Sequence, residues 1–132
     1  MRTMEQKRAK YAYEKVIEAA RPDNGIKNDE YKSHAASLPA MIHTNGLGQA
    51  AAFYKSKGGA REKLYNLLSE WLTRKEHPYG NGNYGKSDLI KGIVNEDMHT
   101  YRMAQSEAQA LMSWVKKAAT AYMREDPSGK EI

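Results

Sequence analysis

LPAMIHTNGLGQAAAFY, residues 38–54, predicts two helices separated by a sharp stop. Asn45-Gly46 marks the end of the first helix, because glycine adopts the left-handed conformation without steric cost. Gly48 and the alanines at 50–52 then predict a second helix, thin enough for another backbone to approach closely. Pro39 fits either a first helical turn, where its missing N–H is not needed, or a kink inside one longer helix. The sequence leaves both interpretations of Pro39 open.

Apolar residues recur at helical spacing along much of the remaining chain. The clearest patterns are Leu64, Leu67, Leu68, Trp71 and Leu72 in one segment, and Tyr101, Ala104, Ala108, Leu111, Met112, Val115, Ala118, Ala119 and Tyr122 in another. We also expect a helix that ends before Pro22, a helix capped by Asn28, and a short helix over residues 87–94. No alternating pattern typical of a β-strand is found.

These patterns predict an all-α fold, a compact bundle of five to six helices with a long C-terminal helix. Residues 1–123 are expected to form a single helical-bundle domain, because a chain of 132 residues has the size of one domain. Residues 124–132 are expected to be a frayed tail. Methionines are expected to fill gaps between the helices, namely Met4, Met41, Met98, Met103, Met112 and Met123.

The composition excludes several classes of protein. The chain has no cysteine, which excludes a disulfide scaffold and thiol catalysis and is typical of the reducing cytoplasm. No run of about 18 apolar residues occurs, so we expect no membrane span. The net charge of +5, together with nine tyrosines, is compatible with RNA, DNA or an acidic protein as partner.

The segment GNGNYGKS, residues 80–87, matches the phosphate-loop pattern G-x-x-x-x-G-K-[ST] at every position. In a nucleotide hydrolase, Lys86 would contact the phosphates and Ser87 the magnesium ion. A phosphate loop follows a buried parallel strand, whereas this segment follows the end of an amphipathic helix. We therefore interpret the segment as a flexible connection, in which Lys86 is a candidate for contact with RNA.

No other residue pattern predicts catalysis. The four histidines, at positions 34, 43, 77 and 99, lack metal-binding spacing. The acidic pairs at 29–30, 96–97 and 125–126 lie where helix starts and tails commonly place acids. We predict no catalytic residue, cofactor, metal or small-molecule substrate.

The basic residues suggest a binding surface instead. They are Lys55, Lys57, Arg61 and Lys63 around Gly58-Gly59, followed by Arg74, Lys75, Lys116 and Lys117. If the fold brings these side chains together, they form a stripe suited to a phosphate backbone. Ordinary solubility, and the preference of cations for helix C-termini, are the competing explanations.

Residues 38–42, 45–49 and 52–54, which read LPAMI, NGLGQ and AFY, resemble the small helical subunit of the Cmr effector complex, the type III-B CRISPR machine that targets RNA. The resemblance implies a non-catalytic scaffold for antiviral defence. Several copies would stack head to tail along the inside of the complex, beside other Cmr subunits, and support the binding of CRISPR RNA and target RNA. It implies RNA or neighbour contacts first for Gln49, Lys55, Lys57 and Arg61.

Two alternatives remain at this level. One is a nucleotide hydrolase that uses residues 80–87, and the other is a free-standing basic helical module that binds nucleic acid by itself. The sequence does not decide which face contacts RNA and which contacts protein. It also leaves open the number of copies and the choice between guide and target contacts.

Overall fold

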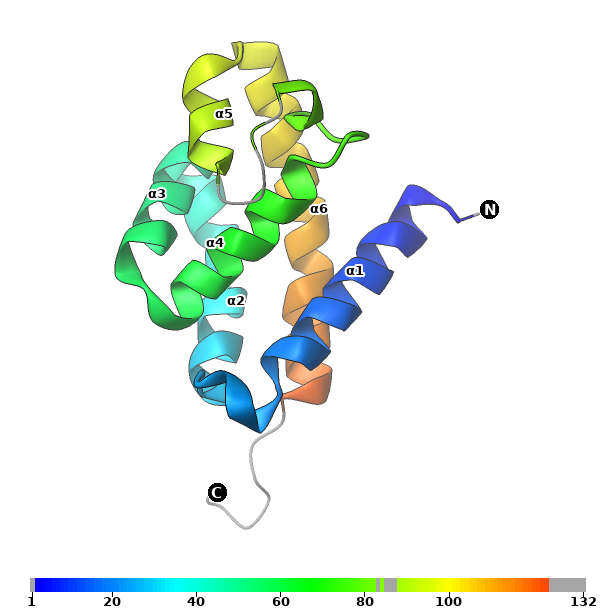
Figure 1. Ribbon diagram of the computed structural model, residues 1–132, viewed down its shortest axis with the longest axis vertical. Coiled ribbons are helices and arrows are strands. Elements are labelled where there is room, and N and C mark those ends of the chain that lie inside the picture. The colour runs from blue at the N-terminus through cyan, green and yellow to red at the C-terminus, as the bar shows by residue number, and fades with distance from the viewer. Residues whose placement is uncertain (1, 83, 85–87, 124–132) are drawn as a thin grey trace.

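The computed structural model describes residues 2–82, 84 and 88–123 (Figure 1). Within these residues lie six α-helices and no strand: α1 (Met4–Ala19), α2 (Asn28–Asn45), α3 (Leu47–Lys57), α4 (Gly59–Leu72), α5 (Leu89–Asn95) and α6 (Met98–Tyr122). Short 3-10 turns occupy Pro22–Asn24 and Gly80–Gly82. The predicted all-α fold with a long last helix is confirmed. The predicted tail at 124–132 lies outside the described residues.

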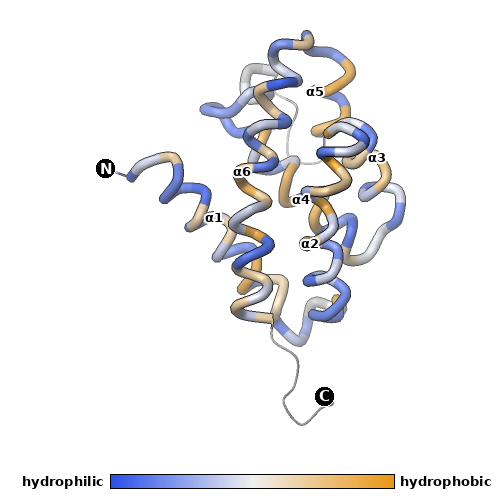
Figure 2. The backbone as a smooth tube through the Cα atoms, turned by 180° about the vertical axis from the view of Figure 1, so that it is seen from behind, coloured by the Kyte–Doolittle hydropathy of each residue, from blue (hydrophilic) through white to orange (hydrophobic). Residues whose placement is uncertain are grey.

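Helix α6 is the central element of the bundle. It contacts α1 along one side and α2 along another, while α4 packs across α2 and α3 (Figure 1). Figure 2 shows hydrophobic and hydrophilic segments alternating along α1 and α6, as expected for helices that bury one face. The largest fully buried side chains come from four helices and the segment before α5, and include Trp71, Tyr31, Tyr54, Tyr65, Tyr79, Leu38 and Ile42.

The junction between α2 and α3 is held by side chains from α6. Helix α2 is continuous through Pro39, so this proline neither starts a helix nor separates two. At the junction Gly46 has φ 88° and ψ 156°. The N–H of Gly48 donates to Tyr101 Oη at 2.9 Å, and that of Leu47 donates to Gln105 Oε1 at 2.9 Å. These acceptors supply two of the hydrogen bonds that the first turn of α3 lacks.

Several local predictions are wrong in detail. Asn28 is the first helical residue of α2 instead of its cap, because Lys27 occupies the cap position without a side-chain hydrogen bond. Met98 and Met103 are 65% and 52% exposed, so they do not fill gaps in the core. Tyr122 is also exposed, and its ring packs edge to face against that of Tyr13, with 5.4 Å between centroids. Helical spacing identified the face of α6 but not the points where the neighbouring helices stop covering it.

Candidate nucleic-acid interface

The turn from α3 to α4 positions most of the predicted basic cluster. Gly58 and Gly59 both have positive φ, 70° and 57°, a conformation that favours glycine and reverses the chain within two residues. As a result, Lys57 at the end of α3 and Arg61 in the first turn of α4 approach the same ring. Lys57 Nζ lies 5.2 Å and Arg61 Cζ 5.4 Å from the centroid of Phe53.

Lys55 extends this surface. Its Nζ lies 5.0 Å from the ring centroid of Tyr65, which is buried beneath it. Lys55, Lys57 and Arg61, together with Phe53, are called the cationic corner below. The corner contains three of the four residues that were named first as candidate contacts, and one aromatic side chain, Phe53, that was not among the candidates.

Within the described part of the chain, no ion pair joins a cation of the corner to an acid. Among the described residues, the ion pairs within 4.0 Å join side chains of α1 to one another, to Glu70 or to Glu107, and join Arg74 to Glu70. None of these pairs includes a cation of the corner. The charge of the corner is therefore available to an external anion.

A neighbouring histidine responds to the charge of the corner. Burial lowers the pKa of His34, and the positive charge of Arg61 lowers it further, although Glu30 acts in the opposite direction. His34 is held in place because its backbone carbonyl accepts a hydrogen bond from Tyr54 Oη at 2.7 Å. The sequence carried no signal for this neighbour, since His34 lies on α2 and reaches the corner only through tertiary packing.

Gln49 continues the corner along α3. Gln49, Phe53 and Lys57 are spaced four residues apart and are all exposed, so they follow one face of the helix. Lys57 lies eight helical steps after Gln49, which gives a track about 12 Å long. Arg61 prolongs this track from α4. The spacing was the one sequence signal that links Phe53 to the candidate contacts.

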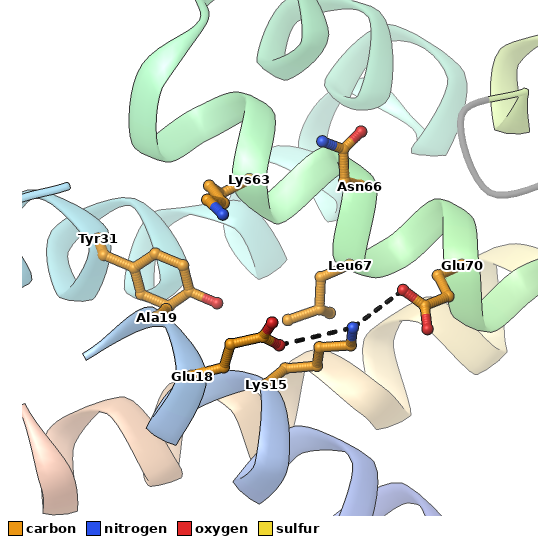
Figure 3. Close-up of a pocket in the computed structure, with 8 residues that line it drawn as sticks. All are labelled: Lys15, Glu18, Ala19, Tyr31, Lys63, Asn66, Leu67 and Glu70. Atoms are coloured by element: carbon orange, nitrogen blue, oxygen red, sulfur yellow. Dashed lines mark ion pairs between the residues drawn. The ribbon is translucent and has the colours of Figure 1, made fainter. Parts of the chain in front are cut away.

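Lys63 lies on a different side of α4. It lines a pocket between α1, α2 and α4, together with Lys15, Glu18 and Tyr31 (Figure 3). In that pocket Lys15 Nζ lies 3.0 Å from Glu70 Oε1 and 3.8 Å from Glu18 Oε1. Acids and bases neutralise each other there, so this pocket offers less to a phosphate backbone than the corner does.

The other predicted cations are not part of the corner. Arg74 follows the C-terminal end of α4, whereas Arg61 lies in the first turn of that helix. Its guanidinium carbon is 4.6 Å from the ring centroid of Tyr11 and 5.0 Å from that of Trp71, which explains its position by packing. Lys75 is exposed just beyond α4, and Lys116 and Lys117 are exposed on the second half of α6. Lys86 lies outside the described residues.

The described part of the glycine-rich segment is explained by close packing. It follows α4 and a turn, not a strand, and Gly80–Gly82 forms a 3-10 turn. A Cβ atom on Gly80 would lie 2.1 Å from the carbonyl oxygen of Arg74, and one on Gly82 would lie 1.9 Å from the ring of Tyr84. Backbone atoms therefore require glycine at position 80, whereas at position 82 a larger residue would have to displace the Tyr84 side chain. The strand that a phosphate loop needs is not found among the residues described.

The described residues offer neither a metal site nor a membrane span. No cluster of three or more His, Asp or Glu side chains suited to a metal ion occurs within the described part of the chain. No helix described there is both long and apolar enough to cross a membrane.

Comparisons with known proteins agree with each other. Residues 4–122 match the sequence model of a family described as "CRISPR-associated protein (Cas_Cmr5)". A protein of Thermus thermophilus named "CRISPR system Cmr subunit Cmr5" is 33% identical over 126 residues, which cover 95% of this chain and all of that one. The crystal structure of a CRISPR-associated Cmr5 family protein from the same organism has a TM-score of 0.76 at 31% identity, covering 93% of this chain and all of the other.

Proposed function

Because this chain belongs to the Cmr5 family of CRISPR-associated proteins, we propose that it is a non-catalytic small subunit of a type III-B Cmr ribonucleoprotein. In this role it assembles with other Cmr subunits and with copies of itself. It supports the binding of CRISPR RNA and target RNA through contacts that do not depend on base sequence.

The cationic corner is the observation that carries the RNA part of this proposal. Three cations without carboxylate partners among the described residues gather there from two helices, Lys55 and Lys57 from α3 and Arg61 from α4. Phosphate contacts of this kind supply affinity and position without reading bases. That is what a scaffold requires if it must accept any guide and target sequence.

The exposed apolar side chains support head-to-tail stacking. Val94 and Met98 are 72% and 65% exposed at the turn into α6, whereas Tyr13 and Tyr122 are 47% and 53% exposed near its other end. The 25 residues of α6 separate these patches by about 36 Å. Two different patches at opposite ends suit a heterologous contact, since a twofold dimer pairs one patch with itself.

Replacing the three corner cations by glutamine tests the RNA role. In a complex reconstituted with its partner subunits and guide RNA, the triple variant Lys55→Gln, Lys57→Gln, Arg61→Gln is expected to bind target RNA about tenfold more weakly at about 0.3 M salt. The slope of log affinity against log salt should fall by about 2, because each lost phosphate contact on a single strand removes about 0.7. Filter binding at several salt concentrations measures both quantities.

The matched control removes the same charge elsewhere. Lys7, Lys27 and Lys91 are exposed on three other segments, and their replacement by glutamine should leave both affinity and salt slope nearly unchanged. Equal losses of RNA affinity in the two triple variants would mean that the corner contributes only through the net charge of the protein. Native mass of the complex gives the copy number, and tight RNA binding by the isolated chain alone would favour a free-standing module instead.

A further inference from the structure

The chain has a single phenylalanine, and it lies at the surface. Phe53 is 38% exposed, although its neighbours in sequence on the inner face of α3, Ala51 and Tyr54, are 0% and 1% exposed. Phe53 is absent from the hydrophobic core and from the side chains packed against it. More than a third of Phe53 is therefore open to a ligand, on a ring that lies outside the core.

The ring of Phe53 is covered by cations and not by another aromatic ring. The adjacent ring of Tyr54 lies 6.2 Å away at an interplanar angle of 58°, so the two do not stack. Its charged neighbours are Lys57 and Arg61, at 5.2 and 5.4 Å from the centroid. Both are long side chains that can leave the ring and follow an anion, because no carboxylate holds them within the described part of the chain.

This combination matches the needs of a single-stranded nucleotide. A nucleobase presents a flat face that stacks on an aromatic ring, and its phosphates pair with cations beside that ring. Stacking of a base on an aromatic ring is worth more than an exposed cation–π contact, so a base can displace Lys57 or Arg61 toward its own phosphates. Gln49, one turn earlier on the same face, adds amide groups without charge.

We propose that Phe53 is a stacking platform for an unpaired RNA base, with Lys57 and Arg61 on the phosphates that flank that base. This inference rests on the proposed RNA-binding function and adds a specific ligand chemistry to it. It assigns the aromatic ring an energetic role that charge alone does not provide. It also assigns the corner a preference for single-stranded RNA over a backbone whose bases are all paired.

The test compares RNA with and without bases. The full chain is titrated, alone and in the reconstituted complex, with a 12-nucleotide oligoadenylate and with a ribose-phosphate oligomer of the same length that carries no bases. Phe53→Leu should weaken oligoadenylate binding about tenfold and leave binding of the abasic oligomer unchanged. Phe53→Tyr keeps an aromatic ring and should restore most of the affinity.

Salt dependence separates stacking from charge. Phe53→Leu should leave the salt slope for oligoadenylate unchanged, whereas Lys57→Gln with Arg61→Gln should lower the slope by about 1.4 for both oligomers. Unchanged thermal unfolding of each variant confirms that the comparison concerns folded protein. This control is needed because Phe53 is 38% exposed, so its replacement by leucine also removes contacts with the protein.

Four outcomes would overturn the inference. If Phe53→Leu weakens the binding of both oligomers equally, or weakens the binding of neither, Phe53 has no stacking role. Loss of RNA binding in the triple cation variant would still support the proposed function in that case. Loss of the subunit from the complex in Phe53→Leu, with unchanged RNA binding by the isolated chain, would make the corner a protein interface. Absence of RNA binding in every form tested would reject the RNA function itself.

Discussion

Gly46→Ala is expected to lower the free energy of unfolding by about 3 kcal/mol. Gly46 combines φ 88° with ψ 156°, a region that is essentially restricted to glycine and costs other residues about 1–3 kcal/mol. A Cβ atom there would also lie 2.9 Å from Tyr101 Oη. That hydroxyl accepts the hydrogen bond from Gly48 N–H, so moving it adds the loss of a bond worth about 1 kcal/mol. Urea denaturation followed by far-ultraviolet circular dichroism measures the change.

Gly58→Ala is the matched control for this prediction. Gly58 also lies between two helices, with φ 70° and ψ −172°, but a Cβ atom on it would meet nothing within 4 Å. The backbone strain is therefore similar and the contact with Tyr101 is missing, so we expect a loss of only about 1–2 kcal/mol. In a Tyr101→Phe background, the effect of Gly46→Ala should fall to that of Gly58→Ala. Equal losses for the two glycines in the parent chain would contradict the role given to Tyr101.

At the junction between α2 and α3, the sequence predicted the end of the helix but not the side chains that hold it. Asn45-Gly46 predicted the end of α2 because local backbone chemistry decides it. The partner side chains Tyr101 and Gln105 were not predicted, since they lie more than fifty residues away and reach the junction only after α6 has packed. Pro39 was left undecided for a related reason. A proline inside a helix is tolerated or not according to its neighbours, and sequence does not supply them.

The candidate site was predicted to a similar extent. Cations on both sides of Gly58-Gly59 were expected to lie near one another, and Lys57 and Arg61 do share the ring of Phe53. Lys63, two residues beyond Arg61, points instead into the pocket beside α1. Two residues correspond to about 200° of helical rotation, so they face opposite sides of α4. The charges in the sequence predict where the cluster lies. Which of the cations belong to it depends on how α3 and α4 are rotated about their axes once they have packed.

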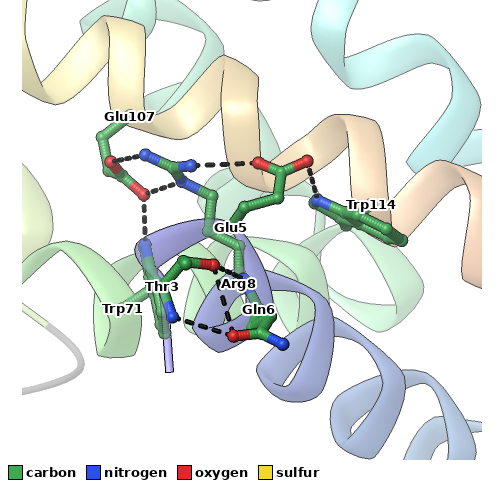
Figure 4. A network of polar contacts seen from close by, with 7 residues as sticks. All are labelled: Thr3, Glu5, Gln6, Arg8, Trp71, Glu107 and Trp114. Atoms are coloured by element: carbon green, nitrogen blue, oxygen red, sulfur yellow. Dashed lines mark hydrogen bonds and ion pairs between the residues drawn. The ribbon is translucent and has the colours of Figure 1, made fainter. Parts of the chain in front are cut away.

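Glu107 on α6 forms hydrogen bonds with residues of two other helices, α1 and α4 (Figure 4). Its carboxylate accepts two hydrogen bonds from Arg8 on α1, at 2.7 Å from Nε and 2.9 Å from Nη2. It also accepts one from Trp71 Nε1 on α4, at 2.8 Å. The side chain of Glu107 is only 13% exposed and that of Arg8 19%. Two parallel bonds from a guanidinium fix both distance and orientation, so this carboxylate sets how α1 and α4 lie against α6.

Glu107→Ala is expected to destabilise the protein by about 3 kcal/mol at pH 7. Among the described residues, the substitution leaves the largely buried guanidinium of Arg8 with the longer contact from Nη1 to Glu5 Oε1, at 3.3 Å. It also removes the acceptor of the Trp71 indole N–H that the described residues supply. Glu5→Gln is the control, because Glu5 is 65% exposed and its ion pair should contribute less than about 1 kcal/mol. Similar losses for Glu107→Ala and Glu5→Gln would contradict a special role for the buried pair.

The pH dependence of stability separates the contribution of the charge of Glu107 from that of its side-chain shape. Burial raises the pKa of this carboxyl, but the hydrogen bonds from Arg8 and Trp71 and the charge of Arg8 outweigh burial, so the folded-state pKa lies below the ordinary 4.5. A carboxyl with a lowered folded-state pKa stabilises the fold fully above its unfolded value, and this contribution disappears as the pH falls through the folded value. Glu107→Gln keeps an acceptor but cannot ionise. The difference in unfolding free energy between the parent protein and Glu107→Gln should therefore be largest near pH 7 and should shrink as the pH falls below 4.5. A difference that stays constant with pH would assign the effect of the substitution to packing.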